Sequence, residues 1–144
     1  PGRPASEIIN QVNLSRTTGR NYVGHVHWSM KSLLQNRGGI STSLAKSTYA
    51  SAALVPPIPW ISKTPPQTPT LKASSTRSGV TAKWGRVRGA SKYAVQARYG
   101  KRWFTIKVLP ATATTINLSG KPDAIAISSV DRYGTTSPPR VVAR

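Results

Sequence analysis

Residues 93–109 read YAVQARYGKRWFTIKVL, a stretch that predicts two antiparallel strands joined by a tight turn. Tyr93, Val95 and Ala97 lie at alternate positions, as expected where one face of a strand is buried. The turn is expected at residues 99–102, where a glycine supplies the backbone freedom that tight turns need. A strand, a turn and a second strand in direct succession indicate an antiparallel sheet.

The alternation continues on both sides of this hairpin. Short strands are also predicted over residues 80–84, 114–118, 124–130 and 140–143. Strands of this length, separated by turn residues at intervals of about 8–12 positions, are typical of a sandwich of two antiparallel sheets. The side chains expected to point into the sandwich are Trp84, Tyr93, Val95, Ile116, Ile125 and Ile127.

A proline-rich segment precedes the sandwich. It comprises PPIPW at residues 56–60 and SKTPPQTP at residues 62–69. Proline lacks an amide donor and favours extended backbone, so a helix cannot continue through this segment. We interpret it as a semi-rigid connection and expect two domains, over residues 1–62 and 63–144.

The first domain is predicted to contain a helix, a strand and a second helix. The first helix is expected to begin at Ser6, before an apolar stripe that includes Ile8 and Val12. The segment YVGHVHWSM, residues 22–30, is rich in β-branched and aromatic residues and predicts a buried strand. The second helix is expected over residues 42–52. A single parallel strand has no partner for its backbone hydrogen bonds, so this domain resembles one part of a larger fold.

The composition limits the chemistry that this chain can perform. Its 144 residues include no cysteine, which excludes a disulfide framework and thiolate zinc sites. Glu7, Asp123 and Asp131 are its acidic residues, too few to predict a catalytic carboxylate pair or a carboxylate cage for a cation. The sequence also lacks a glycine-rich nucleotide loop and an apolar run long enough to span a membrane. We therefore expect no catalytic residue, metal site or cofactor in this chain.

Basic residues are concentrated in the second domain. The chain has 21 lysines and arginines and a net charge of +18, of which +5 lies in residues 1–62 and +13 in residues 63–144. No long block of adjacent basic residues occurs, so the excess reflects missing acids as much as clustered bases. Because folded surfaces of this kind bind anions with little selectivity, nucleic acid is not the expected partner.

Three features of the second domain resemble a fibronectin type III domain. They are the tryptophan of VTAKW (residues 80–84), Tyr93 on the next strand, and an Asp-x-x-Gly-x-x-Ser turn within SSVDRYGTTS (residues 128–137). The resemblance covers residues 66–144 and implies an antiparallel β-sandwich. The sequence departs from the family at Ile125, near which the family has a corner tyrosine.

The order of parts along the chain resembles the C-terminal end of the bacterial glycosyl-hydrolase-like family ten. The motifs are QVNLSR (residues 11–16), GHVHWSM (24–30) and ALVPPIPW (53–60), followed by the type III-like module. The resemblance implies that residues 22–30 are the last strand of a (β/α)₈ barrel and that residues 42–52 are its last helix. It also implies that the missing N-terminal barrel of the parent protein is a partner and holds the catalytic carboxylates.

The expected fold class is therefore mainly β, a fibronectin type III-like sandwich preceded by an α/β segment, with Ile58, Trp60 and Ile61 anchoring the two parts. The function implied is the C-terminal accessory or structural region of a secreted or envelope-associated glycoside hydrolase-like protein. We expect an extracellular or cell-envelope location, an association with carbohydrate and no catalysis by the isolated chain. The alternative is a basic sandwich that binds polyanions, such as an anionic glycan, an envelope polymer or nucleic acid.

Trp28 is the candidate for stacking on a sugar ring. In a strand it would share one face with Gly24 and Val26, and the resemblance places it near the end of a barrel strand, where active sites of this fold lie. The alternative is that Trp28 fills the apolar core. His25 and His27 would share the opposite face, but two imidazoles alone lack the further ligands that zinc needs.

A basic patch with one aromatic residue is the candidate for binding a polyanion. Its members are Arg98, Lys101, Arg102, Trp103 and Lys107. The alternative is a solvated hairpin on which the long side chains cover apolar surface.

Overall fold

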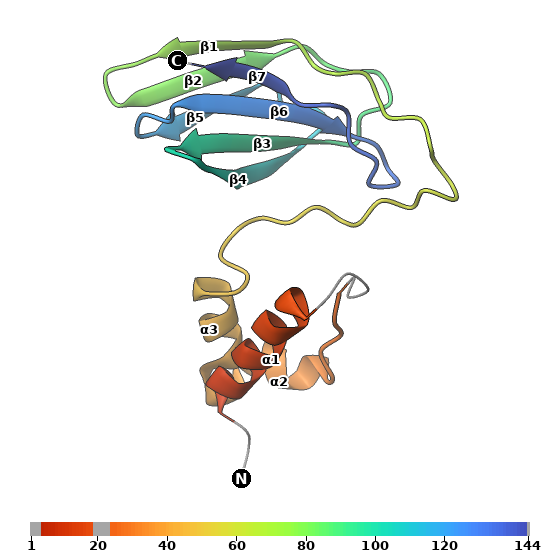
Figure 1. The fold of residues 1–144 in the computed structure, drawn as a ribbon, viewed down its shortest axis with the longest axis vertical. Coiled ribbons are helices and arrows are strands. Elements are labelled where there is room, and N and C mark those ends of the chain that lie inside the picture. The colour runs from red at the N-terminus through yellow and green to blue at the C-terminus, as the bar shows by residue number, and fades with distance from the viewer. Residues whose placement is uncertain (1–3, 19–23, 144) are drawn as a thin grey trace. The chain divides into compact units, whose positions relative to one another are not determined.

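The computed structural model describes residues 4–18 and 24–143, and the chain forms two compact units (Figure 1). The first unit is Pro1–Ala50, which is helical in its described residues, and the second is Ser51–Arg144, which contains the strands. The sequence predicts a domain boundary after residue 62. In the structure the second compact unit begins earlier, at Ser51.

The second unit is a sandwich of two antiparallel sheets, which confirms the predicted fold class (Figure 1). One sheet has the strand order β1-β2-β5 and the other has the order β4-β3-β6-β7. The strands are β1 Leu71–Ser75, β2 Gly79–Trp84, β3 Lys92–Tyr99, β4 Arg102–Pro110, β5 Thr115–Ser119, β6 Ala124–Val130 and β7 Arg140–Ala143. Strands β2 to β7 lie where the sequence predicts them, and β1 is an addition.

The core of the sandwich contains the predicted inward side chains. Tyr93 is fully buried, and its ring makes an edge contact with Trp84 at 5.7 Å between ring centres. The Tyr93 hydroxyl accepts a hydrogen bond from the Val87 amide at 2.7 Å, so this buried phenol is satisfied. Val95, Ile125 and Ile127 are buried in the same cluster, and Ile116 is partly buried against it.

Strands β3 and β4 form the predicted hairpin. Gly100 has a φ of 61° in the turn, a conformation that residues with a β-carbon rarely adopt. Arg98 and Trp103 are direct partners across the two strands. A β-bulge interrupts the regular pairing between Val95 and Gln96, and β4 is an edge strand of its sheet.

The turn between β6 and β7 has the Asp-x-x-Gly-x-x-Ser pattern found in the sequence. The Asp131 carboxylate accepts hydrogen bonds from the amides of Tyr133 and Thr135, each at 2.8 Å. The hydroxyl of Ser137 accepts a hydrogen bond from the Ser129 amide at 3.1 Å, and both serines are buried. The aspartate therefore closes the turn and the serine fastens its far end to β6.

The proline-rich segment contacts this same turn. The Ile58 amide donates a hydrogen bond to the Tyr133 carbonyl at 3.0 Å. A β-carbon at Gly134 would lie 2.8 Å from the carbonyl oxygens of both Val55 and Pro56. The segment is therefore packed on the sandwich, with backbone running close against a glycine.

The first unit consists of short helices in its described residues. They are α1 Ala5–Thr17, α2 Met30–Leu34, the 3₁₀ helix η1 Arg37–Gly39, and α3 Ile40–Lys46. Its buried side chains among these residues are Val12, Ile40 and Leu44, and α1 contacts α3. Within residues 4–18 and 24–143, no helix has both the length and the apolar character needed to cross a membrane.

The predicted strand over residues 22–30 is wrong in its described part. Residues 24–29 form no strand, and α2 begins at Met30, while Tyr22 and Val23 lie outside the described residues. A strand is stabilised by hydrogen bonds to a neighbouring strand, and the described residues of this unit provide none.

The predicted start of the first helix and the predicted range of the second helix also need correction. Pro4 precedes α1, so Ser6 lies inside the helix and does not cap it. This fits proline, whose fixed φ suits the start of a helix. The second predicted helix, residues 42–52, is displaced: α3 ends at Lys46 and follows Gly39, which has a φ of 74°.

Candidate functional site

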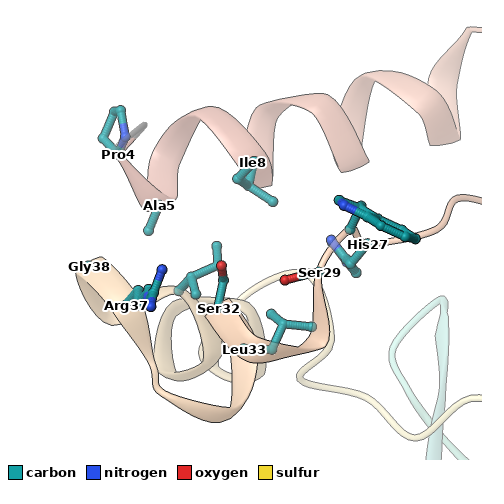
Figure 2. Close-up of a pocket in the computed structure, with 11 residues that line it drawn as sticks. Pro4, Ala5, Ile8, His27, Ser29, Ser32, Leu33, Arg37 and Gly38 are labelled. Carbon is teal, nitrogen blue, oxygen red and sulfur yellow. The ribbon is translucent and has the colours of Figure 1, made fainter. Parts of the chain in front are cut away.

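A pocket of about 540 Å³ lies in the first unit. Figure 2 shows Ile8 of α1 on one side, with Ser32 and Leu33 of α2 on the other. Arg37 of η1 adds a guanidinium group to the lining. Ligand pockets typically have volumes of about 300–1,000 Å³ and combine apolar walls with a few polar groups, and this pocket has both properties.

Trp28 lies at this pocket with its side chain 98% exposed. It belongs to the segment before α2 and not to a strand, so the predicted strand face shared with Val26 does not form. Val26 is itself 91% exposed. The exposure shows that Trp28 does not fill a core within the described chain and that its ring is open to contact from outside.

His25 and His27 converge on the hydroxyl group of Tyr49. The Nε2 atom of His27 lies 2.6 Å from that oxygen, and the Nε2 atom of His25 also hydrogen-bonds to it. The guanidinium carbon of Arg16 lies 5.6 Å from the centre of the Tyr49 ring. The sequence did not reveal Tyr49 as a partner of the histidines, because helices separate them and no local spacing relates them.

Burial and the charge of Arg16 shift the pKa values of His25 and Tyr49. Burial, the neighbouring His27 and Arg16 lower the pKa of His25, so its imidazole is neutral at neutral pH. Burial raises the pKa of Tyr49, although Arg16 opposes the shift, so the phenol keeps its proton. At neutral pH the cluster therefore contains a neutral His25 imidazole and a protonated Tyr49 phenol.

The structure brings together two members of the predicted basic patch. Arg98 and Trp103 face each other across β3 and β4, with the guanidinium carbon 5.8 Å from the indole centre. Trp103 is 41% exposed, while the Nε atom of Arg98 is buried and has no hydrogen-bond partner within the described chain. The two side chains form a cation–π pair, which we call the Arg98–Trp103 pair.

The other three members of the patch are less well aligned with that pair. Lys101 lies in the hairpin turn, where its side chain is exposed. Arg102 pairs with Tyr99 and Lys107 with the core residue Val95. Since direct partners share a face and neighbours along a strand alternate, Arg102 and Lys107 belong to the opposite face of the sheet.

The carboxylates of the chain accept hydrogen bonds from uncharged donors. Glu7 accepts one from the Gln11 side chain at 2.8 Å, and Asp123 accepts one from the Gly100 amide at 2.6 Å. Asp131 accepts one from the Ser62 hydroxyl at 3.0 Å in addition to its two backbone amides. Desolvation raises the pKa of Asp131, but these hydrogen bonds outweigh it and hold the pKa below its ordinary value.

These contacts give each carboxylate a role in the fold. Glu7 lies in the first unit and both aspartates in the second. None of their hydrogen bonds has the form expected of a catalytic acid paired with a second carboxyl group.

Comparison with known proteins finds one partial match in sequence. The chain is 35% identical over 80 residues to a protein named glycosyl hydrolase YngK from Bacillus subtilis (strain 168). The match covers 55% of this chain and 16% of that protein, so the chain spans a small part of the relative's length. No family model matches the chain.

Solved structures give partial similarities. The spore cortex lytic enzyme SleM of Clostridium perfringens is similar over 56% of this chain and 29% of its own, with a TM-score of 0.45 and 20% identity. A fibronectin type III domain of human collagen XX is similar over 64% of this chain and 100% of its own, with a TM-score of 0.43 and 19% identity.

Proposed function

We propose that this chain is the C-terminal accessory or structural region of a secreted or envelope-associated glycoside hydrolase-like protein, and that it has no catalytic activity alone. The partial sequence match to a protein named as a glycosyl hydrolase supports the class. The three carboxylates, each engaged in a structural hydrogen bond, support the absence of glycosidase chemistry in this chain.

The observation that carries the proposal is the exposed apolar surface of the first unit. Val26, Trp28 and Leu34 are 91%, 98% and 80% exposed. Val26 and Trp28 belong to one short segment, and removing such exposed apolar side chains from water by contact with further protein or a ligand is favourable. On the proposed function, the covering element is the N-terminal barrel of the parent protein.

Carbohydrate is the proposed ligand at Trp28. An indole presents a flat apolar face, which suits the apolar face of a sugar ring. Ser29, Ser32 and Arg37 lie at the same pocket and offer hydroxyl and guanidinium groups for sugar hydroxyls. An aromatic face beside a few polar groups is the arrangement expected of a subsite, to which the parent protein would add the reacting groups.

The test is affinity electrophoresis of the purified chain in gels that contain neutral soluble polysaccharides, namely a β-glucan, a xylan and a galactomannan. We expect retardation by at least one of them, lost in Trp28→Ala and kept in Trp60→Ala, which removes another exposed indole. Retardation that survives Trp28→Ala, or turnover of a chromogenic glycoside by the chain, contradicts the proposal.

A second candidate function, polyanion binding, is favoured by the Arg98–Trp103 pair. Its guanidinium group is held against an exposed indole, and residues 63–144 carry a charge of +13. Such a pair can bind an anionic group while the ring contacts the ligand's apolar part.

Salt-dependent retention on heparin tests this candidate. Changing Arg98 and Lys101 to alanine should sharply lower the salt concentration needed for elution, because these side chains would release counterions on binding. The control is alanine at Lys72 and Lys83, which removes the same charge elsewhere on the sandwich. Equal losses in both double variants indicate non-selective attraction and contradict a site.

A further inference from the structure

His27 also lines the pocket at Trp28, but the proposed function gives no role to the cluster of His25, His27 and Tyr49. These are the two histidines of a chain that has no cysteine, and both send their Nε2 atoms to one phenol oxygen. The two imidazole rings stand edge to face with their centres 5.0 Å apart. Three donor atoms of the kind that bind transition metals therefore meet at one point of the first unit.

The hydrogen bonds of this cluster are chemically asymmetric. A phenol has one proton, so it can donate to only one of the two Nε2 atoms. The other imidazole must carry its proton on Nε2 and donate to the phenol oxygen. If neither imidazole carried a proton on Nε2, the phenol proton could serve only one of them. The lone pair of the other Nε2 atom would then face the phenol oxygen with no proton between the two atoms, and a cation between them would be favourable.

We propose that His25, His27 and Tyr49 bind a divalent transition-metal ion such as Zn²⁺ or Cu²⁺, with solvent in the remaining coordination positions. Two imidazoles and one oxygen suit these ions, and three protein ligands with an open position is a common zinc arrangement. The sequence predicted no metal site because a third ligand was missing, and Tyr49 provides it.

Binding of the ion requires the three ligand atoms to separate from their hydrogen-bonded positions. Tetrahedral zinc with bonds of about 2.0 Å separates its ligand atoms by about 3.3 Å. The His27 Nε2 and Tyr49 hydroxyl oxygen are 2.6 Å apart, so this pair needs to separate by about 0.7 Å. Because both imidazoles hydrogen-bond to the phenol oxygen, the ion would take a position close to that oxygen and the Tyr49 side chain would move back to bind it. His25 and Tyr49 are exposed, which gives a hydrated ion access.

Arg16 influences the binding in two opposing ways. Its guanidinium group lies against the Tyr49 ring and donates a hydrogen bond to the Thr48 carbonyl at 2.9 Å. Its positive charge repels a dication but stabilises the phenolate that would bind it. On coordination the phenol proton leaves to solvent and the oxygen becomes a ligand, so binding is accompanied by proton release.

The test is calorimetric titration of the whole, metal-free chain with ZnCl₂ at neutral pH. We expect one ion per chain, with the affinity reduced about tenfold or more in His25→Ala, in His27→Ala and in Tyr49→Phe. Tyr99→Phe is the control, since it removes a phenol oxygen from the sandwich and should leave the affinity unchanged.

Two further measurements keep the outcome independent of how the variants fold. In the unchanged chain, Zn²⁺ should shift the NMR signals of both imidazoles, and Cu²⁺ should produce a visible phenolate-to-copper charge-transfer band. The proposal is overturned by the absence of binding at millimolar Zn²⁺, by binding that persists in the His25→Ala, His27→Ala double variant, or by wild-type affinity in Tyr49→Phe.

Discussion

Asp131, Gly134 and Ser137 show how single residues fix the β6–β7 turn. The aspartate accepts two backbone amides, the glycine takes a φ of 83°, and the serine bonds to the strand before the turn. These three positions belong to the pattern that the sequence identifies, and their roles explain its spacing. Gly134 has a second role: its lack of a β-carbon lets the backbone of the proline-rich segment pack against it.

Gly134→Ala should destabilise the sandwich in two ways, by straining the turn and by disturbing its contact with the proline-rich segment. A β-carbon strains the positive φ and also collides with the carbonyl oxygens of Val55 and Pro56, with an expected total cost of about 1–3 kcal/mol. Gly89→Ala is a matched control, since its φ of 81° is similar but nothing lies within 4 Å of the added carbon. Thermal and urea unfolding measure both. Equal losses in the two variants would show that the contact with the segment contributes nothing.

The low pKa of Asp131 predicts a pH dependence of stability. Its pKa is lower in the folded state, so its contribution is present above the unfolded pKa and is lost as pH falls through the folded value. The unfolding midpoint should therefore fall on acidification below about pH 4, and less steeply in Asp131→Asn. Urea unfolding across this range checks the prediction, and parallel curves for the two proteins contradict it.

At the scale of elements, the strands with clear alternation could be predicted and the irregular ones could not. In β3 the alternate residues Tyr93, Val95 and Ala97 are buried as the pattern requires, while all but one residue of β6 are buried, so β6 is covered on both faces. β1 was missed because only Leu71 is buried and the next four residues are exposed, which leaves no period to detect. Its position comes from pairing with β2, a long-range contact that local pattern does not contain.

At residues 24–29 the sequence predicts a strand that the structure does not contain. Their composition favours a strand, but a strand forms only where a neighbour satisfies its amides. The same limit applied to the candidate sites: Trp28 and the Arg98–Trp103 pair could be found from residue type and turn position. Tyr49 could not, because more than twenty residues separate it from His25 and His27 and no local spacing relates them.

Hydrogen exchange should separate these elements clearly. Amides in β3 and β6, which are paired on both sides, should be the most protected. Amides of residues 24–29, which lie outside any strand or helix, should exchange at nearly unprotected rates. Exchange of the whole chain, read by NMR or mass spectrometry, makes the comparison. Strong protection of 24–29 would mean that these residues pair in solution.

At the scale of the whole molecule, charge is the dominant feature. The chain carries 21 basic residues, and its three carboxylates are engaged by uncharged donors. A net charge of +18 repels itself more strongly in the folded than in the expanded chain.

Added salt should therefore stabilise the fold. Raising NaCl from about 0.01 M to about 0.15 M shortens the screening length from about 30 Å to about 8 Å, so the unfolding temperature should rise. Differential scanning calorimetry at fixed pH measures the change. An unfolding temperature that is constant or lower with salt would show that the positive charges are too far apart to oppose folding.

The bulge between Val95 and Gln96 has a consequence for crowded solutions. Strand β4 ends the sheet and leaves Trp103, Phe104 and Ile106 substantially uncovered. An exposed apolar edge strand can form backbone hydrogen bonds with the edge strand of another copy of the chain. The extra residue breaks the even spacing of outward amides that such pairing would need, and Lys107 sits beside the break. We therefore expect the bulge to oppose pairing of β4 with the same strand of a second copy, the contact from which fibrils grow.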